Sequence, residues 1–178
     1  MNIEEKMQER RELLDRMKES LQEDLIACEV AEPEAEGMPP VLNVILDALA
    51  KDDAEEGAFG EFYFDPIATE EDEIQHFSGV ITLMDDLPKE HLPELFEAIA
   101  YINFILPCGR YCIDKGQSFL AYRLTVPLSM ELSGDALFEE MNICMANAVA
   151  AADIYQEALI RLAAGEVTLD AVKDLIEG

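Results

Sequence analysis

Apolar side chains in the first 28 residues recur at alternating spacings of four and three. The members of this stripe are Ile3, Met7, Leu14, Met17 and Leu21, and Arg10 interrupts it. This spacing places the apolar positions on one side of a helix, so the pattern predicts an amphipathic helix over residues 2–28. Three heptads are short for an independent coiled coil, and two arrangements stay open. The helix either docks on its own domain or pairs with a helix of a second subunit.

The next segment breaks this helix, and a series of strands follows it. Residues 29–40, EVAEPEAEGMPP, are acidic and contain three prolines and one glycine, which predicts a linker. Beyond it, alternating apolar residues predict strands over residues 41–49, 59–66 and 74–86. The residues expected to face the core are Leu42, Val44, Leu46, Phe62, Phe64, Phe77, Gly79, Ile81 and Leu83. A helix is the alternative for residues 41–49, because Ala48, Leu49 and Ala50 prolong the apolar run.

A helix and a hairpin come next along the chain. Pro93 suits the first turn of the helix, and Pro107 and Gly109 are expected to end it. The expected buried stripe of this helix is Leu95, Phe96, Ile99, Ile102 and Leu106. A tight turn at residues 114–116 then needs a positive φ, which Gly116 is expected to supply.

The second strand of the hairpin alternates without a break. Its inward residues are expected to be Leu120, Tyr122, Leu124 and Val126, and its outward residues Phe119, Ala121, Arg123 and Thr125. We therefore expect the hairpin, residues 110–126, to lie in the centre of the sheet. Ser133 is a suitable N-cap for a long helix that ends near Ala164, with Gly165 after it. Thr168 caps a last short helix.

These elements have the order α-β-β-β-α-β-β-α, followed by a terminal helix. Hairpins and a meander make such a sheet mainly antiparallel, with the helices on one face. The expected fold is therefore α+β with a mainly antiparallel, five-stranded sheet. The expected parts are an N-terminal amphipathic helix over residues 1–28, an acidic proline-rich linker over 29–40, and a single α+β domain over 41–178.

The formal net charge of −27 is unevenly distributed along the 178 residues. Residues 37–101 carry 16 acidic and 2 basic side chains. Such a surface repels nucleic acid and anionic membranes and attracts a basic partner, although solubility alone is another explanation. The acidic N-terminus lacks the features of a signal peptide, and four scattered cysteines do not form a disulfide framework. A cytoplasmic protein with no membrane or nucleic-acid partner is therefore expected.

No arrangement of residues for catalysis, metal or cofactor binding is evident in the sequence. Cys108 and Cys112 form a C-x3-C pair, but no further ligands follow at a spacing typical of structural zinc. The only histidines, His76 and His91, are expected at the surface. The acidic run at residues 70–73 lacks the alternating ligands and the glycine of an EF-hand loop, so it is expected to be a solvated loop.

Several segments together resemble the YbjN-like family, whose members are labelled bacterial sensory transduction regulators and share the fold of type III secretion chaperones. The segments are FYFDP, GVITL, INFILPCGRYCIDKG and LAYRLTVPL. The resemblance is best over residues 59–166, weaker over 41–58 and absent from the N-terminal helix and linker. It implies a non-enzymatic protein, frequently dimeric, that binds other polypeptides.

The sequence thus predicts a regulatory module that binds a protein partner, possesses acidic rims suited to a basic partner, and forms a homodimer. The residues expected to contribute are the aromatics Tyr63 and Phe119, the acids Glu70 and Glu71, and Met141 and Met145 of the last long helix. The stripe with the two methionines is suited either to packing on its own sheet or to a subunit contact.

Two other functions stay open at this point. The chain could be an acidic inhibitor or immunity-like protein that occupies a basic site, if the carboxylates of residues 47–73 line one face. It could also be an uncharacterised enzyme, if a concave pocket brings a histidine against Cys108 or Cys112.

Overall fold

A computed structural model describes residues 2–33, 38–49, 57–69, 71–114, 116 and 118–177 of the chain. The helices are α1 (Ile3–Glu23), α2 (Leu92–Ile105), α3 (Gly134–Ala163) and α4 (Leu169–Glu177). The strands are β1 (Cys28–Ala31), β2 (Val41–Leu46), β3 (Ala58–Phe64), β4 (Ile74–Met84), β5 (Arg110–Asp114) and β6 (Phe119–Ser129). A short 3₁₀ turn, Asp47–Leu49, follows β2.

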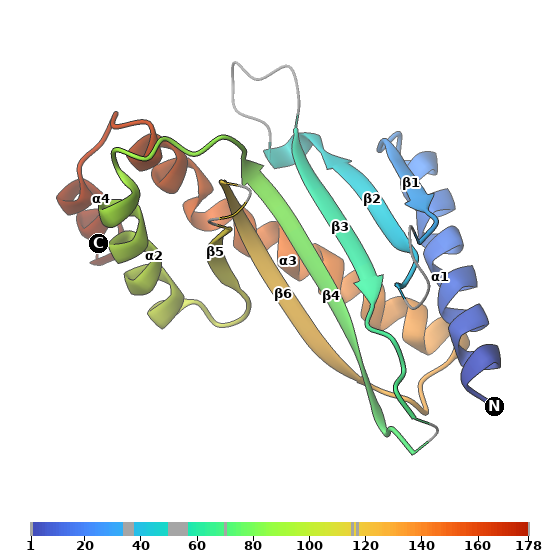
Figure 1. Cartoon of the computed structure of the whole chain (residues 1–178). Coiled ribbons are helices and arrows are strands. Elements are labelled where there is room, and N and C mark those ends of the chain that lie inside the picture. Colours follow the sequence, from blue (N-terminus) through green and yellow to red (C-terminus); the bar gives the residue numbers. More distant parts are fainter. Residues whose placement is uncertain are drawn as a thin grey trace.

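The described strands form a single antiparallel sheet. Its strand order is β1-β2-β3-β4-β6-β5, and each neighbouring pair is antiparallel. The helices α1 and α3 lie on one face of the sheet, α2 and α4 lie beside its β5 edge, and no described helix covers the other face (Figure 1). The α+β class is confirmed, but only α1 and α3 lie on one face as expected, and the sheet has six strands instead of five.

The additional strand begins at the last residue of the predicted helix and continues into the segment that was predicted to be a linker. Helix α1 ends at Glu23, five residues earlier than expected, and Leu25 has a left-handed φ of 64° that turns the chain. Strand β1 then pairs with β2 so that Cys28 lies opposite Val44 and Val30 opposite Leu42. Cys28 and Val30 pack against the core, and this burial stabilises a strand within an acidic, proline-rich segment.

Alternation identified the other strands correctly. Strand β2 buries Leu42, Val44 and Leu46, as predicted, and the helical alternative is confined to the 3₁₀ turn after it. Strand β3 buries Phe62 and Phe64. Their rings pack with Phe77 of β4, with centroids 6.4 Å and 4.9 Å from it.

Helix α1 docks on its own domain in this structure. It buries the side chains of Leu13, Leu14, Met17 and Leu21. Arg10 interrupts the apolar stripe, yet its side chain is only 2% exposed. Its Nε donates to Gln75 Oε1 at 3.1 Å, and its Nη2 donates to the Leu132 carbonyl at 3.2 Å. The guanidinium therefore joins α1 to β4 and to the segment before α3.

Glu9 completes this polar cluster. One of its carboxylate oxygens lies 2.6 Å from Arg10 Nη1, and the other accepts from the Gly134 N–H at 2.9 Å. That N–H belongs to the first residue of α3, where a helix leaves its amide groups without partners. Burial lowers the pKa of Arg10, while the ion pair with Glu9 raises it. Arg10, which breaks the apolar pattern of α1, thus ties α1 to β4 and to the segment before α3, and its ion-pair partner Glu9 ties α1 to the start of α3.

A second set of polar contacts lies along α1 and joins it to the residue that follows β1, and we expect this set to respond to acid. Arg11 donates to Glu32 at 2.8 Å, and Lys18 donates to Asp15 at 2.9 Å. The hydrogen bond from Lys18 lowers the pKa of Asp15, and the one from Arg11 lowers the pKa of Glu32. A lowered folded-state pKa contributes stability above the unfolded value, and that stability is lost as the pH falls through the folded value.

The expected result is a selective loosening of α1 below about pH 4, the ordinary range of carboxyl pKa values. Amide hydrogen exchange, measured in α1 and in β4 between about pH 6 and pH 3 with correction for intrinsic exchange rates, would detect it. In the Arg11→Gln variant the acid sensitivity of α1 should be smaller, because Glu32 has lost its partner. An unchanged acid response in that variant would contradict the assignment.

Two tyrosines connect the hairpin to the helices. Tyr111 of β5 and Tyr122 of β6 lie opposite each other, with ring centroids 5.2 Å apart in an edge-on arrangement. The Tyr111 hydroxyl donates to the carbonyls of Ala151 and Ala152 at 3.0 and 2.8 Å and accepts from the Tyr155 N–H at 3.2 Å. It thus inserts among backbone groups of α3. Burial raises the pKa of both phenols, so both stay protonated at neutral pH.

Asn103 of α2 satisfies the backbone of the edge strand β5. Its side-chain amide donates to the Tyr111 carbonyl at 2.9 Å and accepts from the Tyr111 N–H at 2.8 Å. These two bonds replace those that a neighbouring strand would make. An exposed strand edge otherwise invites pairing with another chain, so the amide satisfies this edge at Tyr111, the second residue of β5.

The hairpin differs from expectation in its place and in its turn. Strand β6 is inside the sheet as predicted, but β5 is at the edge. Gly116 does not have a positive φ; Ser118 does, at 60°, while residues 115 and 117 lie outside the described part of the chain. Ala121, predicted to face outward, is fully buried. The cap residues Ser133, Gly165 and Thr168 lie where they were predicted.

Candidate functional site

Helix α2 is apolar on two sides, and only one of them is buried. Leu95, Ala98, Ile99 and Ile102 face the core. A second set of side chains lies on the outer side, and we call it the α2 ridge. Its members are Phe96, Ala100, Tyr101, Phe104 and Ile105. Phe104 is 90% exposed and the other large members are 36 to 47% exposed. The spacing of four, five, eight and nine residues from Phe96 places them together along one side of the helix.

The surroundings of the α2 ridge are acidic. Helices α2 and α4 together carry five carboxylates, from Glu94, Glu97, Asp170, Asp174 and Glu177, against one lysine. That lysine, Lys173, is held by Glu97 at 2.7 Å and lies 4.8 Å from the centre of the Tyr101 ring. The hydrogen bond to Glu97 raises the pKa of Lys173. The cation is thus already paired, and negative charge remains around the ridge.

The second candidate surface is the sheet face that no described helix covers, which we call the open sheet face. Alternate residues of each strand form it, among them Phe59 and Tyr63 of β3, Val80 of β4, and Arg123 of β6. Burial differs along this face: Phe59 and Arg123 are exposed, whereas Tyr63 and Val80 are half-buried. An antiparallel sheet commonly exposes one face to water, and that face is usually polar. Here the exposed face also carries aromatic side chains.

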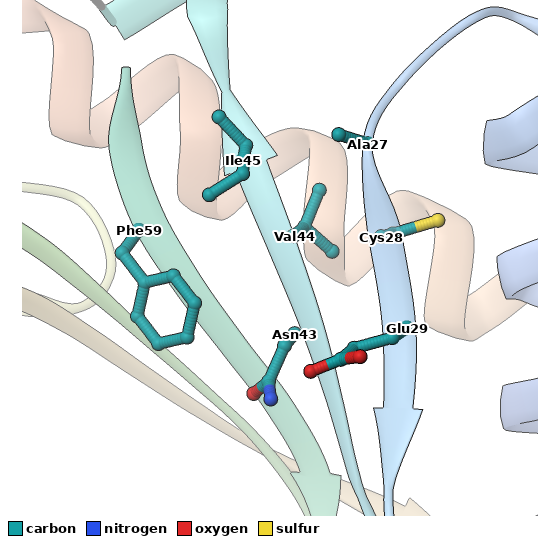
Figure 2. Close-up of a pocket in the computed structure, with 7 residues that line it drawn as sticks. All are labelled: Ala27, Cys28, Glu29, Asn43, Val44, Ile45 and Phe59. Atoms are coloured by element: carbon teal, nitrogen blue, oxygen red, sulfur yellow. The ribbon is translucent and has the colours of Figure 1, made fainter. Parts of the chain in front are cut away.

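A shallow hollow of about 260 Å³ lies at the β1 side of the open sheet face. Its lining is Ala27, Cys28, Glu29, Asn43, Val44, Ile45 and Phe59. Glu29 and Asn43 project from neighbouring strands toward the same side, with the apolar Ile45 and Phe59 beside them (Figure 2). The hollow therefore combines an apolar wall with one carboxylate and one amide. It holds neither a histidine nor a hydroxyl group next to a base.

The residues predicted to bind a partner do not form one site. Tyr63 and Phe119 are both half-buried on the open sheet face, Tyr63 opposite Ser78 and Phe119 opposite Asp114 near the start of β6. Met145 is half-buried and packs on the core, and Glu71 is exposed in the loop before β4. Glu70 lies outside the described residues.

Met141 is fully buried, so it offers no surface to a partner in this structure. The small-residue stripe of the last long helix to which it belongs lies against the sheet, because Cys144, Ala148 and Ala152 are also buried. Packing on its own sheet and a subunit contact were both considered for this stripe, and in the structure it packs on its own sheet.

The thiols and imidazoles are dispersed. Burial raises the pKa of Cys28, Cys112 and Cys144, which makes these thiols poor nucleophiles near neutral pH. His91 packs against Gly165, where an added Cβ would lie 2.5 Å from its Nε2. Within the described ranges, no group of three or more histidine, cysteine and acidic side chains is placed to hold a metal ion.

The α2 ridge was missed in the sequence because Phe96 was assigned to the buried stripe. A second stripe was present as a signal: Phe96, Ala100 and Phe104 recur at intervals of four, and Tyr101 and Ile105 follow beside them. A helix that is apolar all round is buried or carries an interaction surface. Phe104 is 90% exposed, so this side of α2 is not buried.

Comparisons with known proteins show one structural similarity. No helix in the described part combines the length and the apolar character needed to cross a membrane. No family model and no curated protein matches the chain. Among solved structures it matches the crystal structure of YbjN from E. coli, described as a candidate transcription regulator. The TM-score is 0.44 and the sequence identity 13%, over 87% of this chain and 94% of that chain. The chain therefore matches YbjN structurally over most of its length, as the sequence resemblance suggested.

Proposed function

We propose that this chain is a non-enzymatic, cytoplasmic binding module whose α2 ridge receives a cationic amphipathic segment of another protein. The observation that carries the proposal is Phe104, an aromatic side chain that is 90% exposed among other apolar residues of one helix. Exposed apolar patches on proteins commonly mark interaction sites. The end of α2 is anchored, because Asn103 bonds to the Tyr111 backbone and the Tyr122 hydroxyl donates to the Cys108 carbonyl just after the helix.

The apolar residues supply binding energy and the carboxylates supply selectivity. Burying one such phenylalanine against a partner contributes roughly 1.5–3 kcal/mol, and the ridge holds two phenylalanines, a tyrosine and an isoleucine. The acidic rim favours lysine or arginine on the flanks of the bound segment and repels an acidic one. A second copy of this chain is a poor occupant of the ridge, since each copy carries a formal charge of −27.

A defined peptide pair tests this assignment. One peptide is a labelled amphipathic helix of leucine and lysine, and the other has glutamate in place of lysine. Fluorescence anisotropy should detect binding of the lysine peptide alone. The Phe104→Ser variant should weaken it by about tenfold or more, as loss of a central aromatic contact does.

The matched control is Leu25→Ser. Leu25 is 92% exposed and follows α1, which lies beside the β1 edge of the sheet, whereas α2 lies beside the β5 edge (Figure 1). Its replacement removes an exposed apolar side chain of similar size and should leave the affinity unchanged. Equal effects of the two substitutions would show that the peptide binds to the acidic surface without using the ridge.

Capture of partners from the native cell then extends the test beyond a model peptide. Wild type, Phe104→Ser and Leu25→Ser serve as three parallel baits with identification by mass spectrometry. We expect partners with a basic amphipathic segment that bind wild type and Leu25→Ser and are lost with Phe104→Ser. Retention of the same proteins by all three baits would contradict the proposal.

The two other functions gain no support from the geometry. The inhibitor hypothesis requires a continuous acidic face over residues 47–73, and residues 50–56 and 70 of that range lie outside the described part. The enzyme hypothesis requires a histidine in a pocket with Cys108 or Cys112. In the described part of the chain neither the hollow nor the interior gap beside Phe62 is lined by any of these side chains.

A further inference from the structure

A row of charged side chains crosses the open sheet face from one edge to the other. The strand register aligns Glu29, Asn43, Glu61, Val80, Arg123 and Arg110 on successive strands from β1 to β5. Acids thus occupy one half of the row and arginines the other half. Formal charge in this row sums to zero, in a chain whose formal net charge is −27. This row therefore adds no net like charge to a contact with a second copy.

The two arginines of the row lack partners in the single chain. Arg110 and Arg123 lie directly opposite each other on β5 and β6, an arrangement of like charges that is unfavourable across a sheet. Both side chains are exposed, and neither makes an ion pair with a residue that the structure describes. Glu61 is two strands away from Arg123, roughly 10 Å, which is too far for an ion pair within one copy.

We propose that the open sheet face binds a second copy of this chain, with a two-fold axis that lies between the two faces, parallel to β4 and above Val80. Rotation about this axis reverses the row, so that Glu61 of each copy faces Arg123 of the other. Val80 then meets Val80 at the centre. The same surface meets itself, as a two-fold dimer requires.

The neighbouring residues agree with this arrangement. Asn43 occupies the same distance from the axis as Arg110 on the other side, so Arg110 of the second copy comes over Asn43 at the hollow. That hollow also presents the Glu29 carboxylate, a suitable partner for a guanidinium (Figure 2). Phe59 and Tyr63 of β3 come to lie over β6 of the second copy, so that two aromatic side chains per copy are covered.

The size of the face is sufficient for a modest dimer. Five strands at a spacing of about 4.8 Å and strand lengths of about 20 Å give an overlap near 20 by 20 Å for each copy. Counting both copies, the buried surface is on the order of 1,000 Å², at the lower end of specific interfaces. We therefore expect a dimer that dissociates at micromolar concentration, since the area is small and the net charge opposes association.

Charge exchange tests the proposal. Sedimentation equilibrium of the full chain, from about 1 to about 100 µM at moderate salt, gives the dimer dissociation constant. Glu61→Arg and Arg123→Glu should each raise it by about a hundredfold, because each substitution disrupts two symmetry-related pairs and each pair counts about tenfold. The double variant Glu61→Arg with Arg123→Glu should restore dimerisation, because it only reverses the direction of the pairs.

Two control substitutions separate local contacts from overall charge. Glu139→Arg, on the exposed side of α3, changes the charge of the chain as Glu61→Arg does; Lys89→Glu matches Arg123→Glu. If net charge alone mattered, Glu61→Arg would strengthen the dimer, because it makes the chain less negative. We expect Glu61→Arg to weaken the dimer and the control Glu139→Arg not to weaken it. Circular dichroism verifies that each variant is folded. If a single variant is unfolded, the comparison of the double variant with wild type decides.

Several results would overturn the dimer proposal. These are a monomeric wild type at the highest concentration, a dimer that resists both single reversals, or a double variant that stays monomeric while folded. If Phe104→Ser abolished the dimer and Glu61→Arg did not, the subunit contact would lie on the α2 ridge. That result would also overturn the proposed dimer. The proposed binding at the ridge has its own readout in the peptide assay, so either proposal can fail alone.

Discussion

Replacement of Arg10 by methionine is expected to lower the free energy of unfolding by about 2–4 kcal/mol. Methionine keeps most of the side-chain volume, so the loss reflects polar groups and not a cavity. Gln75 Oε1 and the Leu132 carbonyl each lose a donor, and Glu9 loses its ion-pair partner. A buried polar atom left unsatisfied costs about 1–3 kcal/mol, and a broken buried ion pair costs more when both ions are dry. Glu9 is partly exposed, which limits the total.

Urea unfolding of wild type and Arg10→Met measures this loss, and hydrogen exchange shows where it occurs. Protection in α1 should fall more than protection in β4, since Arg10 joins α1 to the rest of the fold. The control is Arg16→Met on the same helix, where an exposed ion pair of 2.7 Å to Asp135 is broken. Exposed pairs contribute about 0–1 kcal/mol, so the control should stay within that range. A loss below about 1 kcal/mol for Arg10→Met would contradict the role assigned to the buried cluster.

The same experiment distinguishes docking within one chain from helix exchange between subunits. If α1 docks on its own domain, the stability lost in Arg10→Met does not depend on protein concentration. If α1 instead packs on a second chain, stability is linked to dissociation and the apparent loss changes with concentration. We expect no dependence, because the Arg10 side chain is only 2% exposed and its acceptors in β4 and before α3 are already within reach of the docked helix.

Periodicity predicted most of the elements, and tertiary contacts decided the rest. Strands β2, β3 and β4 were identified because alternating apolar residues, many β-branched or aromatic, leave one face for the core. Strand β1 was missed because its four residues are too few to show alternation within an acidic segment. It exists because β2 supplies a neighbouring strand and α1 covers its inner face.

The role of Arg10 could not be read from its neighbours in the sequence. Its partners Gln75 and Leu132 are 65 and 122 residues away, so their proximity is a result of the fold. An arginine in an apolar stripe is usually an interruption of that stripe. Here it is buried, because a guanidinium can satisfy several acceptors at once and the fold supplies them.

The candidate site was predicted less well than the fold. The outward direction of Tyr63 and Phe119 follows from alternation and is correct, but neighbours on the sheet half-bury both side chains. The α2 ridge could not be separated from the buried side of the same helix, since both stripes are apolar. Which stripe faces the core depends on where α3 and α4 pack, and the sequence of α2 alone does not contain that information.

The second large effect is expected at Gly109, between α2 and β5. Gly109 has a φ of 62°, in the left-handed region where a side chain costs about 1–2 kcal/mol. An added Cβ would lie 2.0 Å from the Tyr122 hydroxyl oxygen and 2.8 Å from the Arg123 carbonyl oxygen. That hydroxyl donates to the Cys108 carbonyl at 2.8 Å, so it cannot move without losing its acceptor. Strain and overpacking together should make Gly109→Ala cost about 3–5 kcal/mol.

Gly134 provides the matched control, because it separates backbone strain from steric overlap. Its φ is 54°, similar to that of Gly109, but an added Cβ would meet nothing within 4 Å. Gly134→Ala should therefore cost only the left-handed strain, about 1–2 kcal/mol. Urea unfolding of both variants gives the difference, which we assign to the overlap with Tyr122 and Arg123. Equal losses would mean that the hairpin shifts to admit the methyl group at little cost, so the tyrosine pair could not be a rigid link between α2, β5 and α3. A larger loss at Gly109 would establish that this contact holds the end of α2, and with it the α2 ridge, in place.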